Sequence, residues 1–214
     1  MADSYRILSK GAEAEIEEKK SRFICVTFPV ESEEEARARI EEVKKKHYDA
    51  RHNCFAYIIG KKQEIMRYGD DGEPQGTAGR PMLEVLTGEN LCNTLAVVTR
   101  YFGGTLLGTG GLVRAYTGAT QAALAESELT WMKPGIKLHV TADYSNMEKI
   151  KYFIETKSLT PTNLEYGADV QMDVLSPEEL AEEIQKTVTE LSGGKATCQI
   201  VGEAYYPSAE GISI

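Results

Sequence analysis

Apolar and polar positions in the first half of the chain predict several strands. Small and acidic side chains alternate over residues 12–19, and residues 21–28 form a β-rich run that ends at Pro29. Further strand patterns follow at three places, residues 52–59, 64–68 and 94–102. The last of these runs is mostly apolar, which is typical of a strand buried on both faces. We therefore expect a sheet with residues 94–102 near its centre.

A helix is predicted between the second and third of these strands. Ser32 stands three residues before Glu35, the spacing of a capping box in which each side chain bonds to a free backbone amide. The apolar stripe that follows has helical spacing and consists of Ala36, Ile40, Val43 and His47.

The pattern changes at Pro134 and Gly135, a pair that predicts a break in the chain. Strand patterns then occupy residues 136–142, 164–166, 168–175 and 197–204. Two helices are predicted between them, one opening with a capping box at residues 145–148 and one with Ser176 and Pro177. The resulting order, βαββαβ, is that of a ferredoxin-like domain. We expect an α+β protein of two domains, residues 1–132 and 133–214.

Composition and charge narrow the possible partners. The 214 residues carry a formal charge of −9, so the surface as a whole repels nucleic acid and anionic membranes, and only a local basic patch can bind them. The acidity is concentrated in the second domain. The first residues lack the apolar core of a signal peptide, and no apolar stretch is long enough to span a membrane. We expect a cytoplasmic protein.

Cysteine and histidine residues are scattered along the chain. The four cysteines, Cys25, Cys54, Cys92 and Cys198, include no C-x-x-C pair, and three lie in apolar runs, as buried free thiols do. The three histidines, His47, His52 and His139, stand equally far apart. We therefore expect neither a zinc site nor any other metal or cofactor.

Two glycine-rich loops hold the densest candidate chemistry, and each precedes a predicted helix. The first loop contributes Gly76, Thr77, Gly79 and Arg80, followed by Pro81 at the helix start. The second follows the central strand and contributes Arg100, Gly103, Gly104, Gly108, Gly110, Gly111 and Arg114. Loops free of Cβ atoms let backbone amides approach an anion at the positive end of a helix, and the arginines add charge there. The sequence therefore predicts a site for phosphate or a nucleic-acid backbone.

Other interpretations of these residues remain open. Glycines before a helix also serve as simple turn formers, and the loops match neither a Walker A motif nor a dinucleotide fingerprint. Asp70, Asp71 and Glu73 fit either a Mg²⁺ or acid–base role or a polar tight turn. His52 with Cys54 suggests nucleophilic chemistry, but nothing in the sequence completes a triad. We therefore expect no catalytic residues. The aromatic residues Tyr101, Phe102 and Tyr116 fit base stacking or core packing.

Several unusual strings, found in order across residues 18–128, resemble the IMPACT/YigZ family. They are Ser21-Arg22-Phe23, Asp49-Ala50-Arg51-His52-Asn53, Asp70-Asp71-Gly72-Glu73, Thr77-Ala78-Gly79-Arg80-Pro81, and the stretch from Arg100 to Tyr116. The remainder is similar to the small C-terminal domain of the bacterial members. One departure is Leu106, where many relatives place a lysine between the Gly-Gly and Leu-Gly elements.

The resemblance implies a fold and a setting for the activity. It implies a ribosomal protein S5 domain 2-like N-terminal domain and a ferredoxin-like C-terminal domain similar to a domain of elongation factor G. Eukaryotic relatives regulate translation by competing for an activator of an initiation-factor kinase, whereas family membership alone does not define the bacterial role.

Our leading hypothesis is a cytoplasmic protein that binds RNA or the ribosome and modulates translation without catalysis. Two alternatives use other features. One is an enzyme or sensor for a small phosphorylated ligand, with Asp70 and Asp71 holding Mg²⁺. The other is a protein-interaction module acting through the acidic second domain.

Overall fold

The computed structural model describes residues 4–208, which divide into two compact units. One unit runs over residues 5–130, and the other holds residue 4 and residues 131–208. Both units mix helices and strands, which confirms the α+β prediction.

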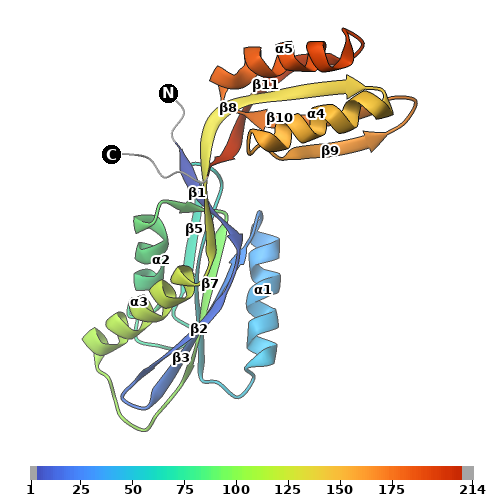
Figure 1. The fold of residues 1–214 in the computed structure, drawn as a ribbon. Coiled ribbons are helices and arrows are strands. Elements are labelled where there is room, and N and C mark those ends of the chain that lie inside the picture. The colour runs from blue at the N-terminus through green and yellow to red at the C-terminus, as the bar shows by residue number, and fades with distance from the viewer. Residues whose placement is uncertain (1–3, 209–214) are drawn as a thin grey trace. The chain divides into compact units, whose positions relative to one another are not determined.

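The N-terminal unit is built on a five-stranded antiparallel sheet with the strand order β2-β3-β7-β4-β5 (Figure 1). These strands are β2 (Glu13–Glu18), β3 (Ser21–Pro29), β7 (Thr94–Tyr101), β4 (His52–Ile59) and β5 (Ile65–Gly69). Strand β7 lies in the middle and is buried along nearly its whole length, as its apolar sequence predicts. The strands predicted from periodicity are confirmed to within a residue or two at each end.

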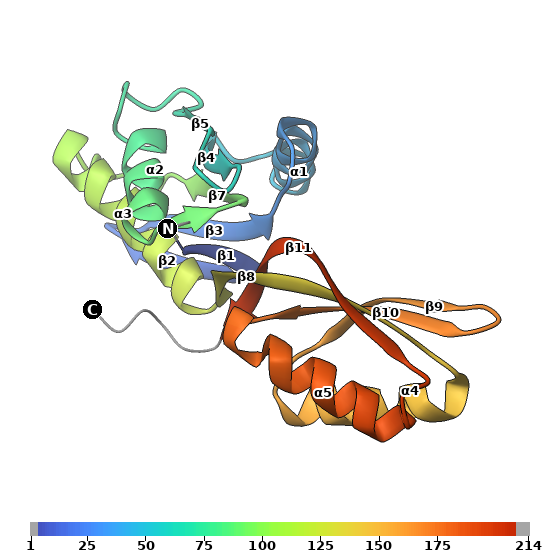
Figure 2. The same ribbon diagram turned by 90° about the horizontal axis from the view of Figure 1, so that it is seen from above.

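Helices cover both faces of this sheet. Helix α1 (Glu33–Lys46) lies on one face, and helices α2 (Gly79–Gly88) and α3 (Thr109–Ala125) lie on the other (Figure 2). Because successive strand residues point to opposite faces, β7 supplies Val97 to the first core and Val98 to the second. The loops before α2 and α3 are thereby fixed against the same side of the sheet.

Helix α1 begins as predicted, with one difference. The Ser32 hydroxyl accepts a hydrogen bond from the Glu35 amide at 3.1 Å. The Glu35 carboxylate accepts from the amide of Glu31 rather than from that of Ser32, so the reciprocal half of the capping box is shifted by one residue.

Three strands were not predicted as they occur. Strand β1 (Tyr5–Lys10) pairs in parallel with β6 (Leu91–Cys92), and neither shows a clear alternation in the sequence. The predicted break at Pro134 is wrong, because β8 (Glu128–Ala142) runs through it without interruption. Pro134 is tolerated there opposite Tyr205 of strand β11. Gly135 is required beside it, since a Cβ atom would lie 2.3 Å from the carbonyl oxygen of Ser176.

The C-terminal unit has the ferredoxin-like plan. Its sheet order is β11-β8-β10-β9, formed with β9 (Pro161–Tyr166), β10 (Val170–Ser176) and β11 (Thr197–Ser208). Helices α4 (Tyr144–Thr156) and α5 (Ala181–Ser192) pack on one face of it through a shared apolar core. This arrangement confirms the βαββαβ prediction.

The helix starts in this unit differ from the predicted ones. Asp143, not Ser145, caps α4, and its carboxylate accepts from the Asn146 amide at 2.8 Å. Ser176 ends β10, and a short 3₁₀ helix (Glu178–Leu180) leads into α5. Gly193 ends α5 in the left-handed conformation at φ 59°, which glycine adopts without steric cost.

Candidate functional site

The first glycine-rich loop is closed around a carboxylate of the protein itself. Asp70 accepts hydrogen bonds from the amides of Gly76 at 2.7 Å, Ala78 at 3.1 Å and Gly79 at 2.8 Å. Two of these residues, Gly76 and Gly79, are ones that the sequence predicted to contact a bound phosphate. The anion expected at the start of α2 is therefore already present as Asp70, which satisfies donors that a helix leaves unpaired.

The other predicted residues of this loop are also engaged. The Thr77 hydroxyl is buried and donates to the carbonyl oxygen of Pro74 at 2.7 Å. Arg80 is exposed on α2 and forms an ion pair with Glu84 at 3.0 Å, one helical turn away. The structure thus gives this first loop, hereafter the closed loop (residues 70–80), a structural role in holding α2 against the sheet.

The second loop, hereafter the open loop (residues 102–111), has no such internal anion. Gly108 precedes α3 at φ 73°, a left-handed conformation that suits glycine, and no side chain caps the helix. The amides of Thr109, Gly110 and Gly111 begin α3, where no intrahelical acceptor is available. In the described part of the chain, these three amides bond to no side chain.

Gly103 of the open loop is required for packing. A Cβ atom on it would lie 2.0 Å from the backbone carbon of Lys20, in the turn between β2 and β3. The open loop therefore lies directly against that turn (Figure 1). The Gly103 amide also donates to the Ser21 hydroxyl at 3.1 Å, which fixes the two segments together.

Arg100 lies beneath the open loop and is not a free cation. Its side chain is 6% exposed and donates to Glu73 at 2.7 Å. The guanidinium also lies over the rings of Phe23 and Phe102, at 5.4 and 5.6 Å. The charge that the sequence analysis assigned to an external anion is therefore matched by a carboxylate within the fold.

Glu73 is the centre of a buried polar network. Its Oε1 atom accepts from Arg100 and, at 2.8 Å, from the Tyr116 hydroxyl. His52 lies on the same side, with Nε2 4.0 Å from that oxygen. Cys54 completes the network through a 3.4 Å contact with the Tyr116 hydroxyl. Glu73, which the sequence grouped with Asp70 and Asp71, thus lies in one cluster with His52 and Cys54.

The protonation of this network argues against a nucleophile. Burial raises the pKa of the Cys54 thiol far above its usual range, so the thiolate is strongly disfavoured. Burial, with the neighbouring Cys54 and Glu73, likewise raises the pKa of Tyr116, which stays protonated and donates to Glu73. The cluster is built to hold a carboxylate in place rather than to generate a reactive sulfur.

A cavity of about 410 Å³ opens above this network. Glu73, His52 and Arg100 lie at its polar side, and the open loop and the start of α3 supply its apolar wall through Phe102, Leu106, Leu107 and Leu112. Phe102 is 44% exposed and Leu106 is 82% exposed, so both remain available to a ligand. The volume lies within the roughly 300–1,000 Å³ that small-molecule sites occupy.

Charged side chains without a partner gather around the same end of the unit. Lys19 and Lys20 lie in the β2–β3 turn that packs on the open loop, and Arg51 lines the cavity. All three are exposed, and no ion pair involves them among the described residues. We call these three residues the basic rim. Arg114, on the second turn of α3, is exposed as well and forms no ion pair within the described range.

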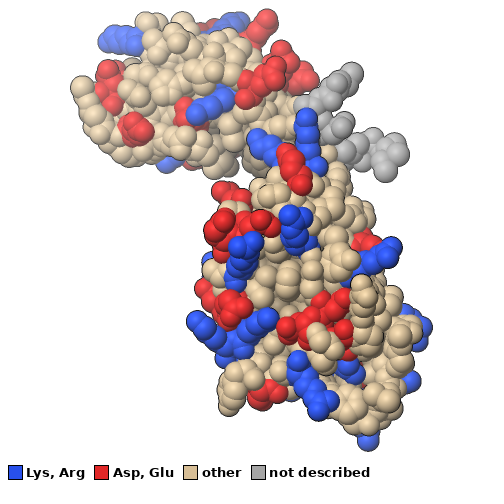
Figure 3. Space-filling view, turned by 180° about the vertical axis from the view of Figure 1, so that it is seen from behind, with Lys and Arg blue, Asp and Glu red and all other residues tan. Residues whose placement is uncertain are grey.

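Most other cations of this unit are paired. Arg22 bonds to Glu15 at 2.7 Å, Lys44 to Asp71 at 3.2 Å and Lys46 to Glu13 at 2.8 Å. Figure 3 shows the consequence, with Lys and Arg side chains standing next to Asp and Glu over much of this unit. The basic rim could not be recognised from the sequence, because only the fold reveals which cations lack a neighbour.

The carboxylates proposed for Mg²⁺ are engaged elsewhere. Asp71 accepts from the Asn53 amide at 2.7 Å and pairs with Lys44, and Asp70 is enclosed by the closed loop. Over residues 4–208, no three His, Cys, Asp or Glu side chains come together in a group able to hold a metal ion.

A second polar cluster lies in the C-terminal unit. Asp173 on β10 accepts from Lys137 at 2.7 Å, His139 at 2.9 Å and Asn163 at 2.7 Å. Burial acts to raise the pKa of Asp173, but these hydrogen bonds prevail and lower it to about 2. The cluster is internally satisfied and holds β8, β9 and β10 together.

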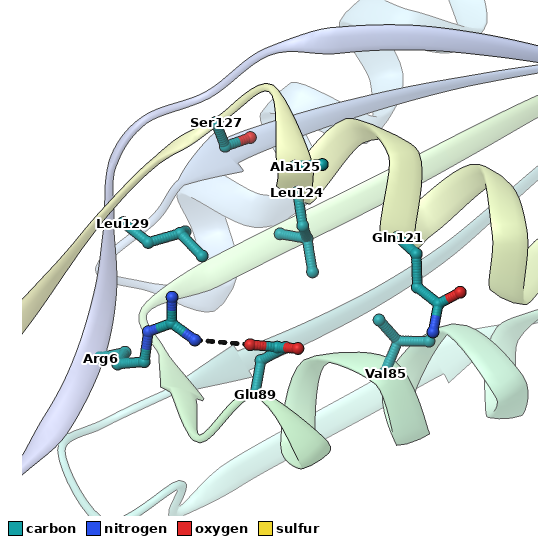
Figure 4. Close-up of a pocket in the computed structure, with 8 residues that line it drawn as sticks. All are labelled: Arg6, Val85, Glu89, Gln121, Leu124, Ala125, Ser127 and Leu129. Carbon is teal, nitrogen blue, oxygen red and sulfur yellow. Dashed lines mark hydrogen bonds and ion pairs between the residues drawn. The ribbon is translucent and has the colours of Figure 1, made fainter. Parts of the chain in front are cut away.

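Another hollow of about 450 Å³ lies at the opposite ends of α2 and α3. Its charged side chains, Arg6 and Glu89, form an ion pair with each other across it (Figure 4). None of the predicted site residues lines it, and its charges cancel. We therefore place the candidate site at the open loop and its basic rim.

None of the helices in the described structure is both long enough and apolar enough to cross a membrane.

Known proteins resemble the chain over most of its length. It is 40% identical to the IMPACT family member YvyE of Bacillus subtilis over 196 aligned residues. The alignment covers 92% of this chain and 90% of that protein. It is 38% identical over 201 residues to an IMPACT family member of Haemophilus influenzae, covering 92% and 97%.

Solved structures resemble it too. A crystal structure of a hypothetical protein matches with a TM-score of 0.60 at 33% identity, covering 94% of this chain and 98% of that one. The structure of the two-domain translational regulator Yih1 matches 55% of this chain and 47% of its own at 26% identity, but its TM-score of 0.38 is too low to support an argument.

Two family models divide the chain between them. Residues 19–124 match the Impact N-terminal domain, and residues 140–195 match a domain of unknown function, DUF1949. The first match contains every predicted site residue. The chain belongs to the IMPACT family.

Proposed function

We propose that this protein regulates translation by binding RNA, on the ribosome, through the open loop and the basic rim. The proposal is carried by the position of the basic rim. Lys19 and Lys20 lie in the turn that packs on the open loop, and Arg51 lines the cavity at the start of α3, whose first amides bond to no side chain among the described residues. Phosphates are bound by such amides and by cationic side chains. The family resemblance supports the translation part, because it implies that eukaryotic members act on translation.

A local basic patch allows an acidic protein to bind RNA. The protein carries −9 overall, so contact with a polyanion depends on a patch where cations outnumber nearby carboxylates. The members of the basic rim form no ion pairs within residues 4–208, so their charge is available to an external polyanion. Binding through the basic rim should weaken as salt rises, since each phosphate contact releases a bound counterion.

The predicted site becomes narrower in this proposal. Gly104, Gly108, Gly110, Gly111 and Arg114 remain candidates for phosphate contact, together with the newly found rim. Gly103 instead serves packing, because its amide donates to Ser21. Gly76, Thr77, Gly79 and Arg80 support the fold through the closed loop, and Arg100 supports the cavity. The alternative of a Mg²⁺-dependent small ligand is less well supported, because Asp70 and Asp71 are both engaged.

Ribosome co-sedimentation tests the proposal. We expect the tagged protein to sediment with ribosomes from its own lysate at low salt and to be released at moderate salt. The variant Lys19→Ala/Lys20→Ala/Arg51→Ala should remain in the supernatant. The control Lys62→Ala/Lys149→Ala/Lys195→Ala removes three exposed cations elsewhere, so it changes the net charge equally. Equal co-sedimentation of both variants contradicts the site, and absence of the wild type from ribosomal fractions contradicts the function.

A further inference from the structure

The polar side of the cavity presents hydrogen-bond acceptors. The Glu73 side chain is 3% exposed, and Oε1 already accepts from Arg100 and Tyr116. Its second oxygen, Oε2, accepts no hydrogen bond from any residue in the described range. A carboxylate has about four acceptor positions, so Glu73 keeps at least two for a ligand that enters the cavity.

His52 adds a second acceptor. Its Nδ1 atom lies 2.9 Å from the backbone carbonyl oxygen of Asp71. A carbonyl oxygen only accepts, so Nδ1 carries the proton and donates it. In the neutral ring Nε2 is therefore an acceptor, and it faces Glu73 at 4.0 Å. A ligand with two adjacent N–H donors would satisfy both groups at once.

The rest of the cavity selects the shape of that ligand. Phe102 and Leu106 are exposed at its opening, and Leu107 and Leu112 line it further in, so its walls are apolar and suit a flat ring. Arg51 also lines it, beside the uncapped start of α3. The cationic opening disfavours a positively charged donor and favours one attached to phosphate.

We propose that the cavity binds the guanine base of a nucleotide. Guanine presents N1–H and the 2-amino group side by side, which match Glu73 and His52. Its phosphate would lie toward Arg51 and the α3 amides. Adenine and cytosine place an acceptor nitrogen beside their amino group, and uracil places its single N–H between two carbonyls. Each of these bases would therefore leave Glu73 or His52 without a donor, or would place an acceptor against it. This inference rests on the proposed RNA-binding function and names the base that is bound.

The first test varies the ligand and leaves the protein intact. Fluorescence anisotropy would compare heptamers of uridine that carry one central guanosine, inosine, adenosine or cytidine. We expect the guanosine heptamer to bind at least tenfold more tightly than the adenosine and cytidine ones, because a mismatched edge leaves buried acceptors unpaired. Inosine lacks the 2-amino group and should fall between them. Equal affinity for all heptamers overturns the inference.

Free guanosine monophosphate distinguishes the two sources of the base. If guanosine monophosphate displaces the guanosine heptamer at the same affinity, the cavity is a mononucleotide site. If the heptamer binds more tightly, the cavity binds an unpaired guanine within RNA. Both outcomes support guanine binding in the cavity. Uniform affinity for all heptamers with steep salt dependence overturns the guanine site and leaves the proposed function standing. If guanosine monophosphate binds but RNA does not, the guanine site stands and the proposed RNA-binding function is overturned.

Two variants test the assigned residues. His52→Ala removes one acceptor, and we expect the guanosine preference to fall severalfold while affinity for the plain uridine heptamer is kept. Glu73→Gln should abolish the preference. Gln75→Ala, exposed on the same turn, is the matched control. Because Glu73→Gln also disturbs Arg100, the His52 result stands as the independent measurement, and an unchanged preference in His52→Ala contradicts the assignment.

Discussion

The two glycine-rich loops of the N-terminal unit look alike in sequence and differ in structure. Each precedes a helix that packs on the same face of the sheet, each contains several glycines, and each has an arginine within it or within a few residues of its end. In the closed loop, Asp70 accepts hydrogen bonds from the backbone amides. In the open loop, the first amides of α3 bond to no side chain among the described residues. The helix dipole attracts an anion in both cases, but within residues 4–208 only α2 has one bonded at its start.

The difference shows what a glycine-rich loop before a helix does and does not indicate. Such a loop indicates amides that can reach an anion, and it does not indicate whether the fold supplies one. Asp70 lies nine residues before Gly79, and the turn between them brings its carboxylate back to the helix start. The open loop rests on the Arg100–Glu73 pair, and no carboxylate from the described part of the chain bonds to its amides.

Breaking the buried Arg100–Glu73 pair beneath the open loop should have the largest effect on stability. Glu73→Ala leaves Arg100 buried without its carboxylate partner, and we expect a loss of about 3–5 kcal/mol in the free energy of unfolding, measured with urea. Replacing both residues with methionine should cost less than the single change, because no charge is then left uncompensated. A loss below about 1 kcal/mol for Glu73→Ala would contradict the buried pair.

Opening the closed loop is the next largest change. Asp70→Ala removes a carboxylate that accepts from three amides, and we expect a loss of about 2–4 kcal/mol. The freed amides should then bind external phosphate. We expect added phosphate to raise the thermal midpoint of this variant by more than that of the wild type. Equal shifts in the two proteins would show that Asp70 does not occupy an anion site.

The backbone of the open loop gives a smaller effect. Gly108 is at φ 73° and ψ 167°, a conformation almost restricted to glycine, so Gly108→Ala should cost about 1–3 kcal/mol. Gly88, at the end of α2, is a matched control, since nothing lies within 4 Å of its Cβ position and its φ is not positive. Gly88→Ala should be neutral or slightly stabilising in the same urea experiment.

The two loop arginines give the smallest change in stability and the clearest contrast in binding. Arg114→Ala should reduce the slope of log K against log salt for single-stranded RNA by about 0.7, the loss of one phosphate contact. Arg80→Ala removes an exposed pair with Glu84, worth about 0.3–0.5 kcal/mol of stability, and should leave that slope unchanged. Equal slopes in the two variants would remove Arg114 from the site.

The parts of the fold that depend on local sequence were predictable. The Ser32 cap of α1, the β3 and β7 runs and the βαββαβ order follow from neighbouring residues, and the structure confirms them. The course of β8 through Pro134 was not predictable, because its pairing with β11 joins residues about seventy positions apart. Tertiary pairing overrides the local turn signal there.

The sequence predicted the location of the candidate site but not the contacts within it. Sequence spacing located both loops and their arginines. It gave no means of knowing that Asp70 fills one loop, that Glu73 neutralises Arg100, or that Lys20 packs on Gly103, because each contact depends on the folded chain. Lys19 and Lys20 carried no signal in the sequence, since unpaired cations are recognised only after their neighbours are known.

The most direct test follows the glycine amides of both loops during one titration. A ¹H–¹⁵N spectrum of the labelled protein, recorded while a short guanosine-containing RNA is added, reports on each amide separately. The account predicts large shifts for Gly110 and Gly111 of the open loop and none for Gly76 and Gly79, whose amides remain bonded to Asp70. Shifts confined to Gly76 and Gly79, or absent from both loops, would contradict it.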